Sequence, residues 1–409
     1  MNRNTDILTT EQKEIDVAAD HVASEYISKS ENMKFKHHNT VRTRSGVDSV
    51  FAIVVLILLC LGTVMVFSAS YAYAEHYFKD SFYFVKKQLI YVALGLIVMF
   101  VASRIDYKTL FKHSYKFFLF VILLMLLTSF TPLGAVHNGA KRWLELGPIS
   151  FQPSELMKLA IVLAFSKYVS QQRLKMKSFV WGILIPMVVI GFVDVLMYFQ
   201  SHMSGMIIMT FMALVMIFLG GCSIWWIIGG GLAACGGVVA FFFLGKGYHG
   251  ARIEAWLDPF KYPLIEGYQT IQSLYSIAQG GLFGKGIGQS SQKNLFLPEP
   301  QNDFIFSIWC EELGFVGAII VILLFGILVW RGIYIALKAS DRFASLVAMG
   351  ISIKVGLQAL LNIAVVTNTI PNTGISLPFF SYGGTSLMFL MIEMGIILSI
   401  SRYSYIEKR

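Results

Sequence analysis

The chain has 409 residues, of which 56% are hydrophobic and only 14% are charged, and its formal net charge is +9. Soluble domains carry about 25% charged residues, so this composition excludes an ordinary soluble protein and predicts an all-α, polytopic membrane protein. Cys60, Cys222, Cys235 and Cys310 lie in or beside apolar segments at no metal-ligand spacing, which predicts neither a disulfide framework nor a zinc site.

The chain begins with a polar segment of mixed charge, residues 1–46. It contains no short apolar core followed by a small-residue cleavage site, so a secretory signal is not predicted. We expect residues 1–46 to be a disordered cytoplasmic tail, and residues 403–409 to be a short cytoplasmic tail at the other end.

Ten apolar segments follow, several of them near the ~20 residues that a spanning helix needs. They are Val50–Ala69, Val85–Ser103, Phe117–Phe130, Ser154–Val169, Phe179–Phe199, Met203–Leu219, Ile224–Leu244, Phe304–Val329, Phe343–Val366 and Leu377–Ile400. We therefore expect a domain of about ten transmembrane helices over residues 47–402. An even number of spans puts both termini on the same side of the membrane.

The loop charges predict which side that is. Lys and Arg gather on cytoplasmic loops, and most of them fall on the side that holds the termini. This topology accounts for the net charge without a nucleic-acid partner. It puts residues 131–153 and 246–303 outside, and the second of these, which precedes the eighth span, is by far the longest loop. Its aromatic residues and glycine-rich turn predict an ordered segment at the membrane surface.

Asp303 is the most informative single residue, because it lies where the long polar loop ends and the eighth apolar segment begins. Two interpretations are open. An aspartate at the start of a helix is a good N-cap. A carboxylate at a membrane boundary is equally suited to be the catalytic group of a membrane-embedded transferase.

Other ionisable side chains fall inside the predicted spans, where they are costly and are functional candidates by default. Glu155 and Lys158 are three residues apart on one helical face and can pair, either structurally or in a site. Lys354 and Glu393 are candidates for a structural role, and so are Glu311 and Glu312. The glycine-rich run Gly280–Gly288 lacks the spacing of a phosphate-binding loop and favours a turn.

Three separated motifs point to a family. Asn138–Gly147 (NGAKRWLELG) with Phe151–Lys158 (FQPSELMK), Leu297–Gly314, and Pro371–Ser386 (PNTGISLPFFSYGGTS) resemble the signatures of the SEDS proteins (shape, elongation, division, sporulation). The resemblance covers roughly residues 45–405, and the chain looks more like the FtsW and SpoVE branch than the RodA branch. It departs at Gln200–Gly205 (QSHMSG), where family members commonly have Gln-Pro-Asp-Leu-Gly-Thr.

This resemblance implies a peptidoglycan glycosyltransferase that polymerises lipid II at the outer face of the bacterial cytoplasmic membrane, with undecaprenyl diphosphate as leaving group. It implies a role in cell division or sporulation, and a position at the division septum. A lipid II flippase and a non-catalytic division scaffold remain as alternatives, because polar groups inside a helical bundle suit a transporter equally well. The implied partners are a class B penicillin-binding protein (a transpeptidase) and other division or sporulation membrane proteins.

The same resemblance assigns expected roles to particular residues. Asp303 is the expected general base, and Lys141, Arg142, Lys158 and Arg252 are the expected cationic contacts to the diphosphate. Glu155 is included among the substrate-binding residues. Trp143 either stacks on a sugar or anchors its loop at the interface. A divalent cation (Mg or Mn) bridging the diphosphate to Asp303 or Glu299 is an open expectation.

Overall fold

The computed structural model describes residues 42–44, 46–137, 140–146, 149–232, 236, 256–264 and 267–407. These residues form two units. In the smaller one, β1 (Arg42–Arg44) pairs antiparallel with β5 (Tyr405–Glu407), with Thr43 opposite Ile406. Most of the predicted N-terminal tail lies outside the described residues, but its residues 42–44 form a strand rather than disordered chain. Residues 405–407 of the predicted short C-terminal tail also form a strand.

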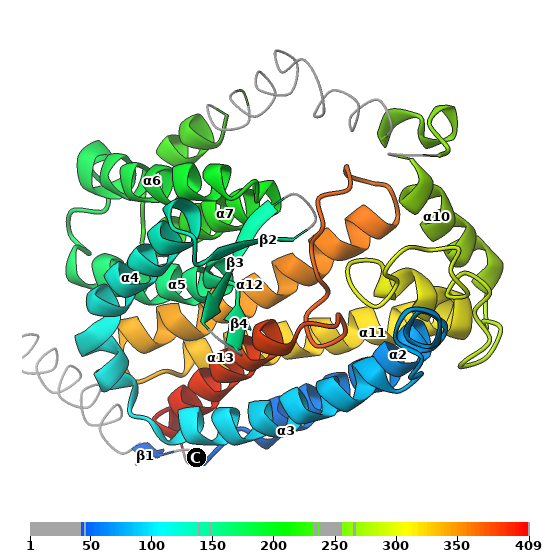
Figure 1. The fold of residues 1–409 in the computed structure, drawn as a ribbon. Coiled ribbons are helices and arrows are strands. Elements are labelled where there is room, and N and C mark those ends of the chain that lie inside the picture. Colours follow the sequence, from blue (N-terminus) through cyan, green and yellow to red (C-terminus); the bar gives the residue numbers. More distant parts are fainter. Residues whose placement is uncertain are drawn as a thin grey trace, which may run out of the picture. The chain divides into compact units, whose positions relative to one another are not determined.

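The larger unit, residues 45–404, is a bundle of long helices (Figure 1). The helices are α2 (Ser49–Phe78), α3 (Tyr83–Arg104), α4 (Tyr107–Phe130), α5 (Pro153–Gln171), the π-helical turn η1 (Val180–Leu184) that continues into α6 (Ile185–Phe199), α7 (Met203–Leu219), the 3-10 turn η2 (Pro259–Lys261), α10 (Tyr268–Gly280), α11 (Ile305–Leu337), α12 (Arg342–Val366) and α13 (Gly384–Arg402).

Seven of the described helical stretches are long and apolar enough to cross a membrane: α2, α3, α4, η1 with α6, α11, α12 and α13. α7 is a shorter apolar helix. Large apolar side chains cover the outside of the bundle, and Leu119, Ile97 and Leu323 are 64%, 60% and 58% exposed. Such a surface suits a lipid environment, so the chain is a polytopic, α-helical membrane protein, as predicted.

Some boundaries differ from the predicted spans. α4 begins at Tyr107 instead of Phe117, because Asp106 accepts a hydrogen bond from the backbone N–H of Lys108 and starts the helix earlier. The last helix begins at Gly384 instead of Leu377, since residues 377–383 are not helical and include a turn at residues 378–380. In the predicted span Ile224–Leu244, residues 224–232 and 236 are helical, and the other residues lie outside the described part of the chain.

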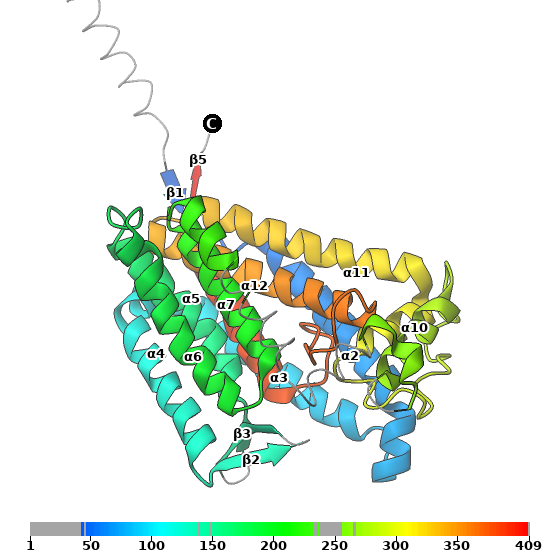
Figure 2. The ribbon, with the colours of Figure 1, turned by 90° about the horizontal axis from the view of Figure 1, so that it is seen from above.

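α12 joins two groups of helices (Figure 2). On one side α11 packs against α2, which packs on α3, and α3 lies along α13. On the other side α4 packs on α5, α6 packs on α7, and both α5 and α7 contact α12. Glycines permit close approach: a Cβ at Gly332 of α11 would lie 2.0 Å from the Ser352 hydroxyl oxygen of α12.

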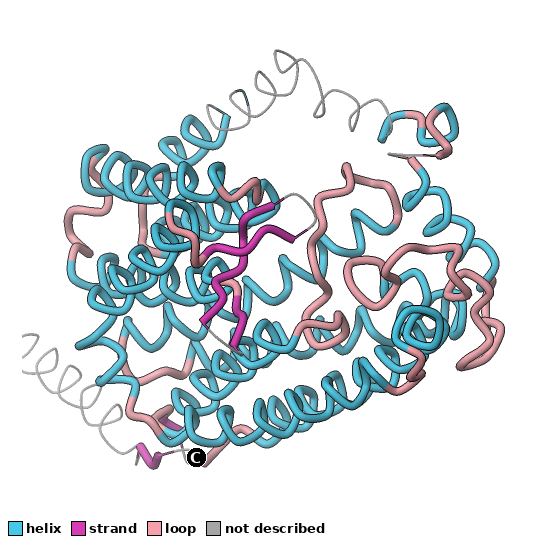
Figure 3. Tube along the Cα trace, viewed as in Figure 1, coloured by secondary structure: helices cyan, strands magenta, loops and turns pink. Residues whose placement is uncertain are grey.

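The segment 131–153, expected as an extracellular loop, contains a small antiparallel sheet of order β2-β3-β4 (Figure 3). Its strands are β2 (Gly134–His137), β3 (Ala140–Leu146) and β4 (Ile149–Phe151). Successive side chains of a strand point to opposite faces. Lys141 and Arg142 are neighbours on β3, so they are directed to different surroundings.

The described part of the long loop before α11 is ordered, as predicted, and its glycine-rich part forms turns that dock on a break in α11. At Gly314 the φ angle is 67°, which interrupts the helix. The N–H of Phe315 donates to the Gly281 carbonyl and that of Val316 to the Leu282 carbonyl. Gly284 has φ of 78°, and a Cβ there would lie 2.2 Å from the Glu312 carbonyl oxygen. These contacts confirm the predicted turn.

Glu311 and Glu312 fix the same loop through their side chains. Glu311 forms an ion pair with Lys285 at 2.7 Å, and Glu312 forms one with Lys293 at 2.9 Å. Glu311 also accepts hydrogen bonds from the Ser276 and Ser290 hydroxyls. Both glutamates are fully buried, and the structural role predicted for them is confirmed. They hold residues 285–293 in place, just before the turn that carries Asp303.

Candidate active site

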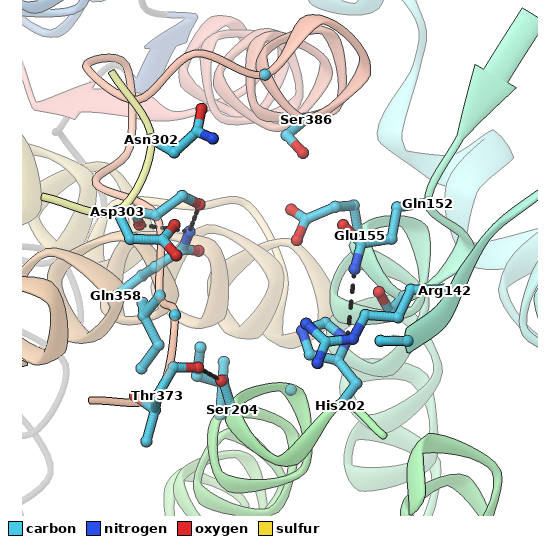
Figure 4. Close-up of a pocket in the computed structure, with 18 of the residues that line it drawn as sticks. Arg142, Gln152, Glu155, His202, Ser204, Asn302, Asp303, Gln358, Thr373 and Ser386 are labelled. Atoms are coloured by element: carbon cyan, nitrogen blue, oxygen red, sulfur yellow. Dashed lines mark hydrogen bonds between the residues drawn. The ribbon is translucent and has the colours of Figure 1, made fainter. Parts of the chain in front are cut away.

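A cavity of about 600 Å³ opens where the small sheet, the α6–α7 turn and the turn before α11 meet (Figure 4). This volume lies in the range of small-molecule sites, about 300–1,000 Å³. All three motifs singled out in the sequence contribute to its lining. The predicted site residues that line it are Arg142, Trp143, Glu155, Lys158, Glu299 and Asp303.

Asp303 lies in a turn just before α11, and its carboxylate faces this cavity. It is not the N-cap, because Phe304 occupies that position and makes no side-chain capping bond. Within the part of the chain that the structure describes, no group donates a hydrogen bond to the Asp303 carboxylate. The N-cap interpretation of Asp303 is therefore wrong.

The backbone around Asp303 is held by its neighbours. The Asn362 side-chain amide of α12 donates to the carbonyls of Asp303 at 2.7 Å and Ile375 at 2.6 Å. Gly374 has φ of 68°, and a Cβ at this position would lie 3.1 Å from the Asp303 carboxylate. These contacts dock the third motif beside Asp303 and leave its carboxylate open to the cavity.

The electrostatic environment of Asp303 raises its pKa to about 6. Burial is the largest cause, and the negative charge of Glu299 adds to it, whereas the positive charge of Arg142 acts in the opposite direction. Glu299 is oriented by Asn302, whose side-chain amide donates to the Glu299 carboxylate at 2.8 Å. A carboxylate with a pKa of about 6 is suited to accept a proton near neutral pH.

Arg142 brings positive charge to the cavity from β3. Its guanidinium donates to the Ser201 carbonyl at 2.5 Å and to the Gln200 carbonyl at 3.4 Å, in the turn between α6 and α7. Figure 4 shows this side chain beside His202, across the cavity from Asp303. Lys141, the next residue back on β3, does not line the cavity. Its ammonium donates to the carbonyls of Thr131 at 2.8 Å and Ser129 at 3.4 Å.

The second cation at the cavity is Lys158 of α5. Its ammonium forms an ion pair with Glu155 at 2.7 Å and lies 3.4 Å from the side-chain oxygen of Gln358 on α12. The pairing follows from their spacing along one helix face. Both Glu155 and Lys158 line the cavity, so the pair inferred from the sequence belongs to the site's wall. Arg252 lies outside the described residues.

His202 also lines the cavity, although neither the spacing of the motifs nor the family resemblance predicts a role for it. Burial lowers its pKa to about 3, and the neighbouring charge of Arg142 acts in the same direction. The ring is therefore neutral at pH 7. The Gln152 amide lies 3.4 Å from its Nδ1 atom. The signal in the sequence is the departure at Gln200–Gly205, where His202 stands at the position of the family's aspartate.

Residues of the third motif, Pro371–Ser386, also line the cavity, although the family resemblance assigns them no individual roles. They are Asn372, Thr373, Gly374, Ile375, Ser376, Tyr382, Gly383, Gly384, Thr385 and Ser386. The Tyr382 N–H donates to the Gln301 carbonyl at 2.8 Å, which ties this motif to the turn that carries Asp303. Sequence spacing could not reveal that contact, because the two segments are about 80 residues apart.

Among the described residues, no three side chains of His, Cys, Asp or Glu gather in the manner of a metal site. Asp303 and Glu299 are nevertheless two carboxylates on one cavity, and carboxylate oxygens suit Mg²⁺, which is often held by one or two carboxylates together with substrate phosphates.

The family model FtsW/RodA/SpoVE, described as a cell cycle protein, matches residues 48–406. The chain is 41% identical to the stage V sporulation protein E of Bacillus subtilis, with 88% of this chain and 98% of that protein covered. It is 38% identical to a probable peptidoglycan glycosyltransferase FtsW of a Geobacter species, with the same coverage.

Two solved structures share the fold. One is described as a peptidoglycan synthase complex that coordinates polymerization and crosslinking; it has a TM-score of 0.73 and 28% identity, and 87% of this chain and 98% of that chain are covered. The other is the rod shape determining protein RodA of Thermus thermophilus, with a TM-score of 0.63, 26% identity, and coverage of 87% and 97%.

Proposed function

The chain belongs to the FtsW/RodA/SpoVE family of cell cycle proteins, and we infer that it is a peptidoglycan glycosyltransferase. It polymerises lipid II into glycan strands at the outer face of the cytoplasmic membrane during cell division or sporulation. The observation that carries this proposal is the Asp303 carboxylate, which faces a cavity of about 600 Å³ together with Arg142 and Lys158.

In this reaction Asp303 acts as the general base. It takes the proton from a sugar hydroxyl as that oxygen attacks the anomeric carbon of a second lipid-linked disaccharide. The new glycosidic bond forms as the bond from the anomeric carbon to the diphosphate oxygen breaks. Base catalysis of this kind contributes roughly 10²–10⁴-fold in rate. With its pKa raised to about 6, Asp303 is a stronger base than an ordinary carboxylate, and it is still mostly unprotonated at neutral pH.

The departing undecaprenyl diphosphate carries the electron pair of the broken bond, so negative charge grows on its oxygens. Arg142 and Lys158 are the cations of the described cavity wall, and preorganised cations stabilise developing charge. Lys141 does not contribute to this stabilisation, because its ammonium is held by backbone carbonyls away from the cavity.

We place the cavity at the outer membrane face and both termini in the cytoplasm. The support is the bias of Lys and Arg toward the loops on the side of the termini. A class B penicillin-binding protein is the proposed partner, and the division septum is the proposed location. The fold shared with a structure described as a peptidoglycan synthase complex supports such an association.

The test is polymerisation by purified protein, reconstituted in liposomes with its penicillin-binding partner and lipid II. Wild-type protein is expected to give glycan strands on a gel, and Asp303→Asn is expected to fold, to co-purify with the partner and to give no polymer. The matched control is Asp341→Asn. Asp341 caps α12 through the Ala344 N–H, lies outside the cavity, and is replaced by an equally good cap.

Normal polymerisation by Asp303→Asn would show that the base is assigned wrongly. Lipid II scrambling by the wild type with no polymer would favour the flippase. Partner binding with neither polymer nor scrambling would favour the scaffold.

A further inference from the structure

Two ion pairs lie one behind the other where α5, α12 and α13 meet. Glu155 and Lys158 of α5 form the first, at the cavity wall, with 2.7 Å between the charged atoms. In the second, the Lys354 ammonium of α12 donates to the Glu393 carboxylate of α13. The Lys354 and Glu393 side chains are only 4% and 1% exposed, and neither lines the main cavity.

A small side chamber of about 50 Å³ connects the two pairs. Glu155, Lys354 and Gln358 all line it, and Glu155 and Gln358 also line the main cavity. Gln358 follows Lys354 by one helical turn on α12, and its side-chain oxygen lies 3.4 Å from the Lys158 ammonium. The second pair therefore has a direct route of influence on the first.

The charges of this group balance, with two carboxylates and two ammonium groups. Glu393 depends on Lys354, because its other carboxylate oxygen, Oε1, is buried without a hydrogen-bond partner among the described residues. A buried charge that loses its partner draws strongly on any other counter-charge within reach. The other cation of this group is Lys158, which contacts Gln358 at the edge of the side chamber.

We propose that Lys354 and Glu393 are a positioning pair that sets how much of the Lys158 charge faces the cavity. Because Lys354 neutralises Glu393, the Lys158 ammonium stays available to interact with Glu155 and with the ligand. The inference rests on the proposed function in one respect, that the ligand in the cavity is an anionic lipid diphosphate. Lys354 and Glu393 tune the binding of this ligand without touching it.

The two single neutralisations have opposite effects on ligand binding. Lys354→Met leaves two carboxylates for one lysine, so Lys158 is drawn inward and the KM for lipid II rises. Glu393→Gln leaves two lysines for one carboxylate, so the cavity becomes more positive and KM falls. We expect each shift to be roughly tenfold, on the order of what one unit charge contributes across a partly buried site.

A purely structural pair behaves differently. Each single variant leaves one buried charge unpaired, so both lower the Tm, and a structural role gives no reason for KM to move in opposite directions. The double variant Lys354→Met/Glu393→Gln leaves no charge unpaired. It is expected to regain most of the Tm and a KM near the wild-type value, and Lys354→Arg is expected to keep both.

The experiment measures Tm, kcat and KM for lipid II with the full-length chain and its partner in nanodiscs. Binding of undecaprenyl diphosphate provides a second readout that needs no turnover. The matched control is the ion pair of Arg331 and Asp48, 2.9 Å apart and outside the cavity. Arg331→Met and Asp48→Asn are expected to lower Tm without moving KM.

A higher KM in Lys354→Met and a lower KM in Glu393→Gln, matched by the diphosphate affinities, support the proposal. Equal KM values in the two variants, shifts of the same sign, or opposite shifts in the reverse direction overturn it. If Lys354→Met does not fold, Glu393→Gln and the double variant test the proposal. A fall in KM in Glu393→Gln that the double variant reverses supports it, and an unchanged or higher KM in Glu393→Gln overturns it. Absence of polymer from the wild type would instead overturn the proposed function, and the diphosphate affinities would still test the positioning pair.

Discussion

Glu299 and Asp303 lie in the same turn at the wall of the cavity, and the negative charge of Glu299 adds to the effect of burial in raising the pKa of Asp303 to about 6. Arg142, on the opposite side of the cavity, acts against this shift. Burial is the largest cause of the raised pKa, and the carboxylate beside Asp303 and the guanidinium across from it adjust that pKa in opposite directions. The pH dependence of polymerisation can test both.

Polymerisation by the wild type is expected to fall as the pH drops through about 6, because Asp303 must be unprotonated to accept a proton. Glu299→Gln removes the nearby negative charge, so the pKa of Asp303 falls and the acid limb of the pH–rate profile moves to lower pH. The measurement is kcat/KM for lipid II between pH 4.5 and 8. An acid limb that stays in place in Glu299→Gln would contradict this coupling.

Arg142→Gln is expected to move the same limb to higher pH, since the Arg142 charge lowers the pKa of Asp303. It should also raise KM by roughly 10–100-fold, because a charge-assisted hydrogen bond to the diphosphate contributes about 1.5–3 kcal/mol. Lys141→Gln is the matched control, a neighbouring cation held by the Thr131 and Ser129 carbonyls. A comparable rise of KM in both variants would argue against the assignment of Arg142 to the diphosphate.

Asp303→Asn is expected to be more thermally stable than the wild type at pH 8. A carboxyl whose pKa is raised on folding from 3.8 to about 6 favours the folded state at low pH. It progressively loses that contribution as the pH rises through this interval, so above it the ionised group costs stability on the order of 1–3 kcal/mol. The check is Tm at pH 8 and at pH 4. The gain from Asp303→Asn should shrink at the lower pH, and a pH-independent difference would contradict the stated cause.

Gly284→Ala is expected to lower the Tm, with an estimated cost of at least about 1 kcal/mol for the positive φ alone. The added Cβ would also meet the Glu312 carbonyl oxygen at 2.2 Å. Because this turn precedes the one that carries Asp303, kcat should fall with it. Gly191→Ala is the control, since a Cβ at Gly191 of α6 meets nothing within 4 Å. An unchanged Tm in Gly284→Ala would show that the turn at the α11 break is free to shift.

The sequence alone was sufficient to predict a polytopic, α-helical membrane protein, because apolar composition and segment length directly reflect a lipid environment. It was also sufficient to place Asp303 at the boundary of an apolar helix and Glu155 beside Lys158, since helical spacing brings residues three apart onto one face. It did not predict the sheet of residues 134–151, whose short strands carry no strong alternating pattern and depend on pairing with each other.

What composition, spacing and motif resemblance determined was a bundle of membrane helices with Asp303 at one end. Only the tertiary structure decided which side chains meet that aspartate. It directs Arg142 into the cavity and Lys141 away from it. It also adds His202 and the third motif to the cavity wall, and it sets Lys354 and Glu393 behind Lys158. The physical reason is that contacts between different helices depend on how each helix is rotated and how deep it sits, and a local pattern in the sequence specifies neither.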